Sequence, residues 1–156
     1  MSPVESSAVE SSTGEQPPVG IVVVSHSRAL GTAAAELAHE VVGTDVPIAV
    51  AAGLDDTTSG TDAAAIATAI ATTDRGSGVV VLMDLGSAVL SAETALELID
   101  DDVRERVVLS PAPLVEGLVG AAVTAAAGAD RDRVAAEALR GLAPKQAHLG
   151  EPAGEG

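Results

Sequence analysis

Four continuous apolar runs alternate along the chain with longer segments in which apolar residues recur at helical spacing. A short, continuous apolar run is typical of a strand that is buried on both faces of a parallel sheet. The runs therefore predict four strands, over residues 19–25, 47–53, 78–84 and 106–110.

Each apolar run precedes a pattern that predicts a helix with one side packed on the sheet. Gly43 can end the first of these helices. Thr61 or Asp62 can cap the start of the second helix, and Ser87 can cap the start of the third. A further helix is predicted over residues 130–142. The apolar positions that set the pattern are Leu30, Ala34, Leu37 and Val41, then Ala65, Ile66, Ala69 and Ile70, then Val89, Ala92, Leu96 and Ile99, and finally Leu114, Leu118 and Ala121.

The alternation of strands and helices predicts an α/β fold, a single doubly wound domain with a mainly parallel four-stranded sheet and helices on both faces. In such a sheet the ligand site lies beyond the carboxyl ends of the strands, where the strand order reverses. The search for a site therefore narrows to the loops that follow those ends. These loops cover residues 25–27, 53–62, 84–87 and 110–113.

The two ends of the chain depart from this pattern. Residues 1–18 are rich in Ser, Glu and Pro and have no periodic apolar positions, which is typical of a disordered tail. Residues 143–156 are similar in character and predict a second, loose tail. We therefore expect one domain over residues 19–142.

The chain has a formal net charge of −15, and Lys145 is its only lysine. This charge argues against binding to nucleic acid or to an anionic membrane, because both would be repelled. An acidic chain that is poor in lysine is also expected of a halophilic protein, since concentrated salt screens the repulsion between like charges. The longest apolar stretch, residues 118–129, is shorter than a bilayer span of about 20 residues, so a cytoplasmic location is expected.

His26 follows the first predicted strand and precedes a helix start. At that position an imidazole can act as a nucleophile, a base or a metal ligand, or it can simply occupy a turn. A metal site is disfavoured, because the chain has no cysteine and because His39 falls inside a predicted helix and His148 in the tail. Ser25 and Ser27 flank His26 and can donate hydrogen bonds to an anion.

Asp84 closes the third predicted strand. If the first and third strands are neighbours, its carboxylate lies near His26, where it can fix the tautomer and the orientation of the ring. The alternative is that Asp84 only caps the next helix or turn. Gly86 and Ser87 then offer close approach of the backbone and a hydroxyl at a helix start. The same order, a glycine followed by capping residues, occurs at residues 60–62.

Three segments, in this order, resemble one known family. They are VVVSHSRALG at residues 22–31, the segment from IAVAAGLDD at residues 48–56 to GTDAAAI at residues 60–66, and VLMDLGSAVLSAETALELI at residues 81–99. They are similar to the DhaM family, the IIA-type subunits of phosphoenolpyruvate-dependent dihydroxyacetone kinases, which is related to the mannose-type IIA domains of the phosphotransferase system. The likeness spans roughly residues 19–127, and the segment around MDLGSA is its specific part.

The resemblance implies a doubly wound homodimer that carries a phosphoryl group on the histidine after the first strand. His26 matches this phospho-accepting histidine, and Asp84 matches the acidic residue that orients it. The family's loop near the site is matched by Gly60, Thr61 and Asp62, and the motif that flanks the phosphate is matched by Gly86 and Ser87.

The resemblance also implies a set of partners. In the family the phosphoryl group comes from the phosphohistidine of the carrier HPr and passes to ADP held on the subunit DhaL. The resulting ATP phosphorylates dihydroxyacetone on the subunit DhaK. Some members continue into HPr-like and enzyme-I-like domains, and we expect the donors of this chain to be separate proteins. No cofactor and no metal of its own is expected.

Other functions stay open at this point. A mannose-type IIA carrier of a sugar phosphotransferase system shares the fold and the histidine, and a regulatory sensor of phosphorylation is a further alternative. A response-regulator-like receiver is disfavoured, because it needs an acidic pair after the first strand and a lysine late in the chain.

Overall fold

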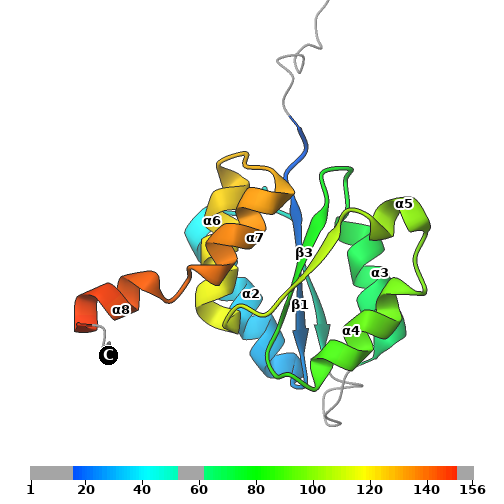
Figure 1. The fold of residues 1–156 in the computed structure, drawn as a ribbon, viewed down its shortest axis with the longest axis horizontal. Helices are drawn as coiled ribbons and strands as arrows, with labels where there is room; N and C mark the ends of the chain where they lie inside the picture. Colours follow the sequence, from blue (N-terminus) through cyan, green and yellow to red (C-terminus); the bar gives the residue numbers. More distant parts are fainter. Residues whose placement is uncertain (1–15, 53–61, 151–156) are drawn as a thin grey trace, which may run out of the picture.

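The computed structural model describes residues 16–52 and 62–150, and Figure 1 shows a sheet between two layers of helices. Four parallel strands form the sheet, in the order β2-β1-β3-β4. The four predicted strands are confirmed, to within one residue at each end. They are β1 (Gly20–Ser25), β2 (Ile48–Ala52), β3 (Val79–Met83) and β4 (Val107–Ser110).

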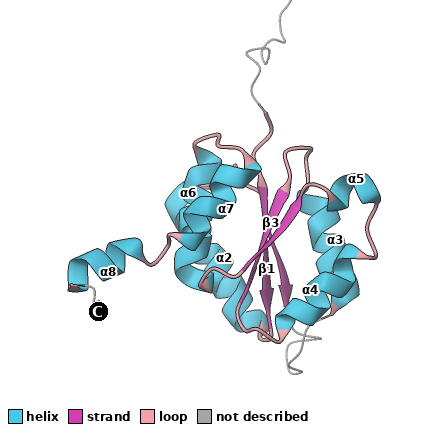
Figure 2. Ribbon diagram, in the orientation of Figure 1, coloured by secondary structure: helices cyan, strands magenta, loops and turns pink. Residues whose placement is uncertain are grey.

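Helices connect the strands and follow the last of them (Figure 2). Asp62 caps the helix that follows β2, as one of the two predicted residues, and Gly43 ends the helix that follows β1. In the described ranges the helices are α2 (Arg28–Val42), α3 (Ala63–Thr73), α4 (Ala88–Leu96), α5 (Asp101–Arg104), α6 (Leu114–Ala126), α7 (Arg131–Leu139) and α8 (Ala143–Leu149).

The helix after β3 is shorter than the apolar pattern predicts. It ends at Leu96, because the backbone N–H groups of Glu97 and Leu98 bond to carbonyls only three residues back and tighten the last turn. Ile99, predicted on this helix, lies in the turn before α5. Its side chain is half-buried against the core, so the apolar pattern reflects burial there without a helix.

The strand order reverses between β1 and β3. β1 pairs with β2 on one side and with β3 on the other, with Val24 opposite Met83. The carboxyl ends of β1 and β3 therefore lie side by side. This is the arrangement that the prediction from the sequence requires for Asp84 to lie near His26. In doubly wound sheets this is the position at which ligands bind.

The two faces of the sheet have separate cores. α2, α6 and α7 cover one face, and α3 and α4 cover the other (Figure 1). Successive residues of β1 point to opposite faces, so Ile21 and Val23 join the first core and Val22 and Val24 join the second. All four side chains are fully buried, which confirms that the apolar run is a central strand covered on both sides.

Gly31 lies in the first turn of α2, directly against the sheet. A Cβ atom at this position would lie 2.8 Å from Cγ1 of Val50 and 3.2 Å from Cβ of Ser25. Glycine therefore allows the start of α2 to approach the end of β1 closely. This packing fixes the short segment that contains His26.

The segment after α7, which the sequence predicts as a loose tail, begins with α8. Every residue of α8 is exposed, and the helix contacts the domain through an ion pair between Lys145 and Glu116 of α6. Among the described residues, no helix is long and apolar enough to cross a membrane.

Candidate functional site

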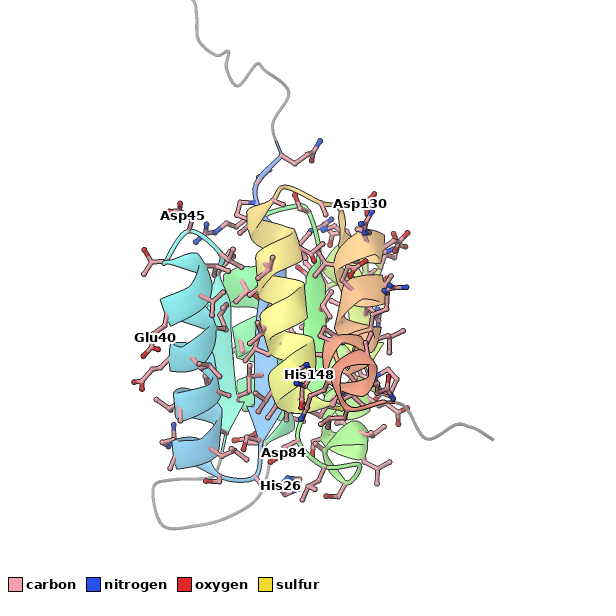
Figure 3. The ribbon with its side chains drawn as sticks, turned by 90° about the vertical axis from the view of Figure 1, so that its left-hand side faces the viewer. His26, Glu40, Asp45, Asp84, Asp130 and His148 are labelled. Atoms are coloured by element: carbon pink, nitrogen blue, oxygen red, sulfur yellow. The ribbon has the colours of Figure 1, made fainter. Side chains whose placement is uncertain are left out.

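His26 lies between the end of β1 and the start of α2, at the edge where the strands end (Figure 3). Ser25 is the last residue of β1 and is fully buried. Ser27 is the N-cap of α2, with extended backbone, and its hydroxyl accepts a hydrogen bond from the backbone N–H of Leu30 at 3.2 Å. The sequence Ser-His-Ser thus ends a strand and starts a helix within three residues, which holds His26 at the sheet edge.

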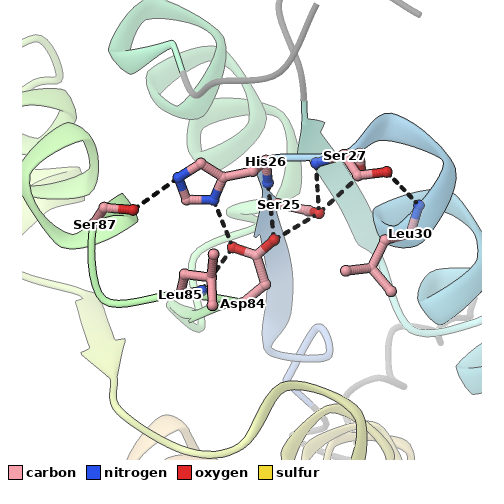
Figure 4. A network of polar contacts seen from close by, with 7 residues as sticks. All are labelled: Ser25, His26, Ser27, Leu30, Asp84, Leu85 and Ser87. Atoms are coloured by element: carbon pink, nitrogen blue, oxygen red, sulfur yellow. Dashed lines mark hydrogen bonds and ion pairs between the residues drawn. The ribbon is translucent and has the colours of Figure 1, made fainter. Parts of the chain in front are cut away.

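Asp84, in the loop after β3, contacts His26 twice. Oδ1 of Asp84 lies 2.9 Å from Nδ1 of the ring, and Oδ2 accepts a hydrogen bond from the backbone N–H of His26 at 2.9 Å (Figure 4). A carboxylate only accepts hydrogen bonds, so Nδ1 carries a hydrogen, and in the neutral ring Nε2 has the lone pair. The contact with Asp84 therefore sets both the orientation of the ring and its tautomer.

Ser87 lies on the other side of the ring. Its Oγ is 2.9 Å from Nε2 of His26, and because Nε2 has the lone pair, the hydroxyl is the donor (Figure 4). Ser87 takes the N-cap position of α4, as predicted, but its hydroxyl makes no capping hydrogen bond because it points to His26 instead. The His26 side chain is 25% exposed, so a group from another molecule can reach it.

The pKa of the Asp84 carboxyl lies below its ordinary value. Burial raises the pKa, since the side chain is only 9% exposed, but the backbone and ring hydrogen bonds from His26 oppose this effect. Hydrogen bonds from the Ser25 hydroxyl and from the backbone N–H of Leu85 lower the pKa further. Asp84 is therefore a carboxylate at neutral pH and stabilises positive charge on the ring.

The hydroxyl of Ser25, at the end of β1 as predicted, is bonded within the site. Its hydroxyl lies 2.9 Å from Oδ2 of Asp84 and 2.8 Å from the carbonyl oxygen of Ser27, and it accepts a hydrogen bond from the N–H of Ser27 at 3.0 Å. A fully buried hydroxyl with these partners does not meet an external anion. The expectation that Ser25 donates to an anion therefore does not fit its geometry, and the residue holds Asp84 instead.

The turn between β3 and α4 presents backbone donors beside the ring. In the described part of the chain, the N–H groups of Gly86 and Ser87 have no hydrogen-bond acceptor. A Cβ atom at Gly86 would have no atom within 4 Å, so packing within the protein does not require glycine there. These N–H groups belong to the turn whose Ser87 hydroxyl lies 2.9 Å from Nε2 of His26, and they are suited to binding an anion.

Other predicted site residues are not assembled with His26 in the described structure. The carboxylate of Asp62 accepts hydrogen bonds from the first backbone N–H groups of α3, at 2.9 Å from the N–H of Ala64. Gly60 and Thr61 lie outside the described residues. The loop at residues 110–113 lines a cavity that shares Asp84 with the site, although the sequence gives this loop no chemical signal.

The histidines do not gather into a metal site. His39 lies in the last turn of α2, about 20 Å along the helix from His26. Across residues 16–52 and 62–150, no group of three His, Asp or Glu side chains is placed to hold a metal ion. What the arrangement offers chemically is a nucleophilic Nε2 atom, a carboxylate behind the ring and donors beside it.

Comparisons with known proteins identify relatives of the chain. Residues 20–135 match the EIIA-man family model, described as the PTS system fructose IIA component. The chain is 46% identical over 140 residues to a protein of Escherichia coli (strain K12) named as the phosphoryl donor subunit DhaM of the PEP-dependent dihydroxyacetone kinase. That match covers 88% of this chain but 30% of the relative, so the chain spans about a third of that protein's length.

A shorter relative is matched over nearly its full length. It is the phosphoryl donor subunit DhaM of the PEP-dependent dihydroxyacetone kinase 2 of Listeria innocua, 40% identical over 119 residues, with 76% of this chain and 95% of the relative covered. Among solved structures, the protein of unknown function EF1359 has a TM-score of 0.71 and 31% identity, with 79% of this chain and 94% of that chain covered. A sigma-54 interaction domain protein from Enterococcus faecalis, at 15% identity and a TM-score of 0.63, covering 88% of this chain and 98% of that chain, shares the fold.

Proposed function

The chain belongs to the DhaM family of IIA-type phosphotransferase subunits, and on that basis we propose that it is the phosphoryl carrier of a phosphoenolpyruvate-dependent dihydroxyacetone kinase. In this proposal the phosphoryl group passes from HPr to His26 and then to ADP bound on DhaL. The ATP so formed phosphorylates dihydroxyacetone on DhaK. One observation supports the role above all: Asp84 holds Nδ1 of His26 and leaves the lone pair on Nε2.

In the first transfer, the lone pair on Nε2 attacks the phosphorus atom. A bond forms between phosphorus and Nε2, and the bond between phosphorus and the nitrogen of the donor's histidine breaks, so that the donor's ring takes back its electron pair. The ring of His26 gains positive charge as the bond forms, and the Asp84 carboxylate stabilises that charge. Ser87 releases Nε2, and its hydroxyl can then donate to a phosphoryl oxygen.

In the second transfer, a terminal phosphate oxygen of ADP attacks the phosphorus atom. The bond to Nε2 breaks, its electron pair returns to the nitrogen, and ATP is formed. The ring of His26 is neutral again, with its hydrogen still on Nδ1 beside Asp84. No proton has to leave or enter the site in either step, which suits a site whose charged side chain is a carboxylate held behind the ring.

A second candidate function is a sugar-specific IIA carrier. The description of the matching family model supports it, and its chemistry at His26 is the same. The curated relatives, which are named as subunits of a dihydroxyacetone kinase, support the first proposal. The two functions differ in the molecule that accepts the phosphoryl group, so the acceptor distinguishes them.

We also propose the setting in which the chain acts. It is a cytoplasmic homodimer that takes part in glycerol metabolism through dihydroxyacetone. The net charge of −15 supports adaptation to high salt, because salt screens the repulsion within the acidic surface. Sedimentation at low and high KCl measures both the dimer and its dependence on salt.

The function is tested by following the phosphoryl group. Phosphoenolpyruvate, enzyme I and HPr should label the chain once. His26→Ala should abolish labelling, and His39→Ala, a control in α2, should not. Adding the labelled chain to DhaL with ADP and to DhaK should produce dihydroxyacetone phosphate. Labelling of His26→Ala at normal yield, or dihydroxyacetone phosphorylation that does not depend on this chain, would refute the proposal.

A further inference from the structure

A cavity of about 480 Å³ lies beside the contact between His26 and Asp84, at the carboxyl ends of β3 and β4. Asp84 belongs to that contact and also to the cavity wall. Another part of the wall comes from α4, through Val89 and Glu93, and a third part comes from the end of β4, through Leu109. A group bound in this cavity would therefore lie beside Asp84, the residue that holds the reacting histidine.

The cavity wall is mainly apolar, and the charged groups among its described lining residues are both carboxylates. Asp84 already has its hydrogen-bond partners within the site. Glu93 is exposed and has no hydrogen bond or ion pair with any described residue. Its carboxylate is therefore available to a cation from another molecule.

Exposed apolar side chains lie at the start of α4, next to the cavity. Leu85 is 60% exposed, Leu90 is 73% exposed and Val89 is 37% exposed. We call these three residues, Glu93 and the cavity the α4 surface. Several exposed apolar side chains within one short segment are typical of contact with another protein.

We propose that the α4 surface binds the phosphoryl-accepting subunit of the kinase, and that an arginine or lysine side chain of that subunit lies in the cavity against Glu93. The apolar walls suit the methylene stem of such a side chain, and the Glu93 carboxylate suits its charged end. The inference rests on the proposed function, because it assigns a partner to the same site.

Repulsion between negative groups at the site is the reason we expect the acceptor to supply a cation. In the second transfer, the phosphoryl group on His26 meets the phosphates of ADP, and the chain itself has a net charge of −15. Repulsion between these negative groups opposes the approach of the acceptor. The described lining of the cavity contains no basic residue. A basic side chain beside Asp84 would offset this repulsion close to the group that is transferred.

The test compares two glutamates of the same region. Glu93→Lys and Glu97→Lys change the net charge equally, but Glu97 lies at the end of α4 and outside the cavity wall. Each variant is phosphorylated with phosphoenolpyruvate, enzyme I and HPr, isolated, and mixed with increasing amounts of DhaL carrying ADP. Rapid quenching measures the rate of phosphoryl transfer at each DhaL concentration. These rates give the maximum transfer rate and the DhaL concentration at which half of that maximum is reached.

We expect Glu93→Lys to raise this DhaL concentration about tenfold and Glu93→Gln to raise it about threefold. The Glu97→Lys variant should stay within about twofold of the unchanged chain, as should labelling of every variant by HPr. Added salt should reduce the difference between the unchanged chain and Glu93→Gln, because salt screens the pair. Circular dichroism checks that the exposed substitutions leave the fold intact.

Three results would overturn the inference. Equal effects at Glu93 and Glu97 would show a general effect of charge. A defect in labelling by HPr with normal transfer to DhaL would assign the α4 surface to the donor. Normal values for both Glu93 variants would leave the cavity without a role in docking. Failure of the unchanged chain to pass its phosphoryl group to DhaL would instead refute the proposed function, and this is seen without any variant.

Discussion

The hydroxyl of Ser25 lies 2.9 Å from Oδ2 of Asp84, and Ser25 is fully buried. The hydroxyl oxygen of Ser25 also accepts a hydrogen bond from the backbone N–H of Ser27 at 3.0 Å. A strand end, a helix start and a carboxylate from the neighbouring strand thus meet at one oxygen atom. The position of Asp84 beside His26 depends on a hydroxyl that does not touch the ring.

Ser25→Ala should slow phosphorylation and also weaken the fold. We expect the free energy of unfolding to fall by about 1–3 kcal/mol, because the N–H of Ser27 loses its acceptor, and labelling by HPr to slow about tenfold as Asp84 gains freedom. Ser27→Ala is the control, since it removes the cap of α2, worth about 1 kcal/mol, and leaves the contact with Asp84. Urea unfolding and labelling time courses measure both effects, and equal slowing in the two variants would contradict the role of Ser25.

Asp84→Asn tests the stabilisation of charge on the ring. The amide is nearly the same size but neutral, so it cannot stabilise the positive charge that forms on His26 during transfer. We expect labelling in a single turnover to slow about 100-fold or more. Asp62→Asn provides a carboxylate control at a helix cap that has no contact with the ring in the described structure. Labelling of Asp84→Asn at the rate of the unchanged chain would remove the proposed role of the carboxylate.

Gly86→Ala tests whether the backbone of this turn receives the phosphoryl group. The added methyl group meets no atom of the protein within 4 Å, so stability should change by less than about 0.5 kcal/mol. The methyl group would stand on the backbone that we expect to receive the phosphoryl group, so labelling should slow about tenfold. Normal labelling of a stable Gly86→Ala protein would show that the group is bound elsewhere around the ring.

An ion pair between Asp74 and Arg106 links the end of α3 to the start of β4. The hydrogen bond from Arg106, at 2.6 Å, is the main cause that lowers the pKa of Asp74. Burial raises this pKa, but the N–H groups of Gly76 and Gly78 add to the lowering. Because the pKa in the folded state lies below the unfolded value of 3.8, Asp74 stabilises the protein above that pH. This stabilisation is lost as the pH falls through the folded pKa.

Asp74→Asn should therefore lower the free energy of unfolding by about 2 kcal/mol at neutral pH and by much less in strong acid. Urea unfolding of both proteins between pH 2.5 and pH 7 measures the difference. The difference should be constant from about pH 5 upward and should shrink below about pH 4. A difference that is the same at every pH would show that the ion pair does not contribute through the charge of Asp74.

The sequence predicts the parts of this molecule that depend on burial. Val22 and Val24 face one core and Ile21 and Val23 face the other, so the run had to be apolar at every position, and that pattern is visible without a structure. The closeness of His26 and Asp84 also follows from topology, because adjacent parallel strands deliver both residues to one edge.

Other features depend on local geometry that the pattern does not contain. Burial of Ser25 and its bond to Asp84 result from the close approach of α2 to the end of β1. In the sequence, the only sign of this approach is a glycine, Gly31, within a predicted helix. The end of α4 at Leu96 depends on hydrogen bonds of the last turn, while Ile99 keeps the apolar character of a helix position. The cavity next to Asp84 is formed by three separate segments, so no single motif marks it.

The most direct test of the account is to identify the ring nitrogen that receives the phosphoryl group. The chain, labelled with ¹⁵N in its histidines and phosphorylated through enzyme I and HPr, can be studied by NMR through the coupling between phosphorus and nitrogen. Because Nδ1 of His26 is held by Asp84, the account predicts one phosphoryl group per chain, bound to Nε2 of His26 and lost to ADP when DhaL is added. A phosphoryl group on Nδ1, or on any residue other than His26, would contradict it.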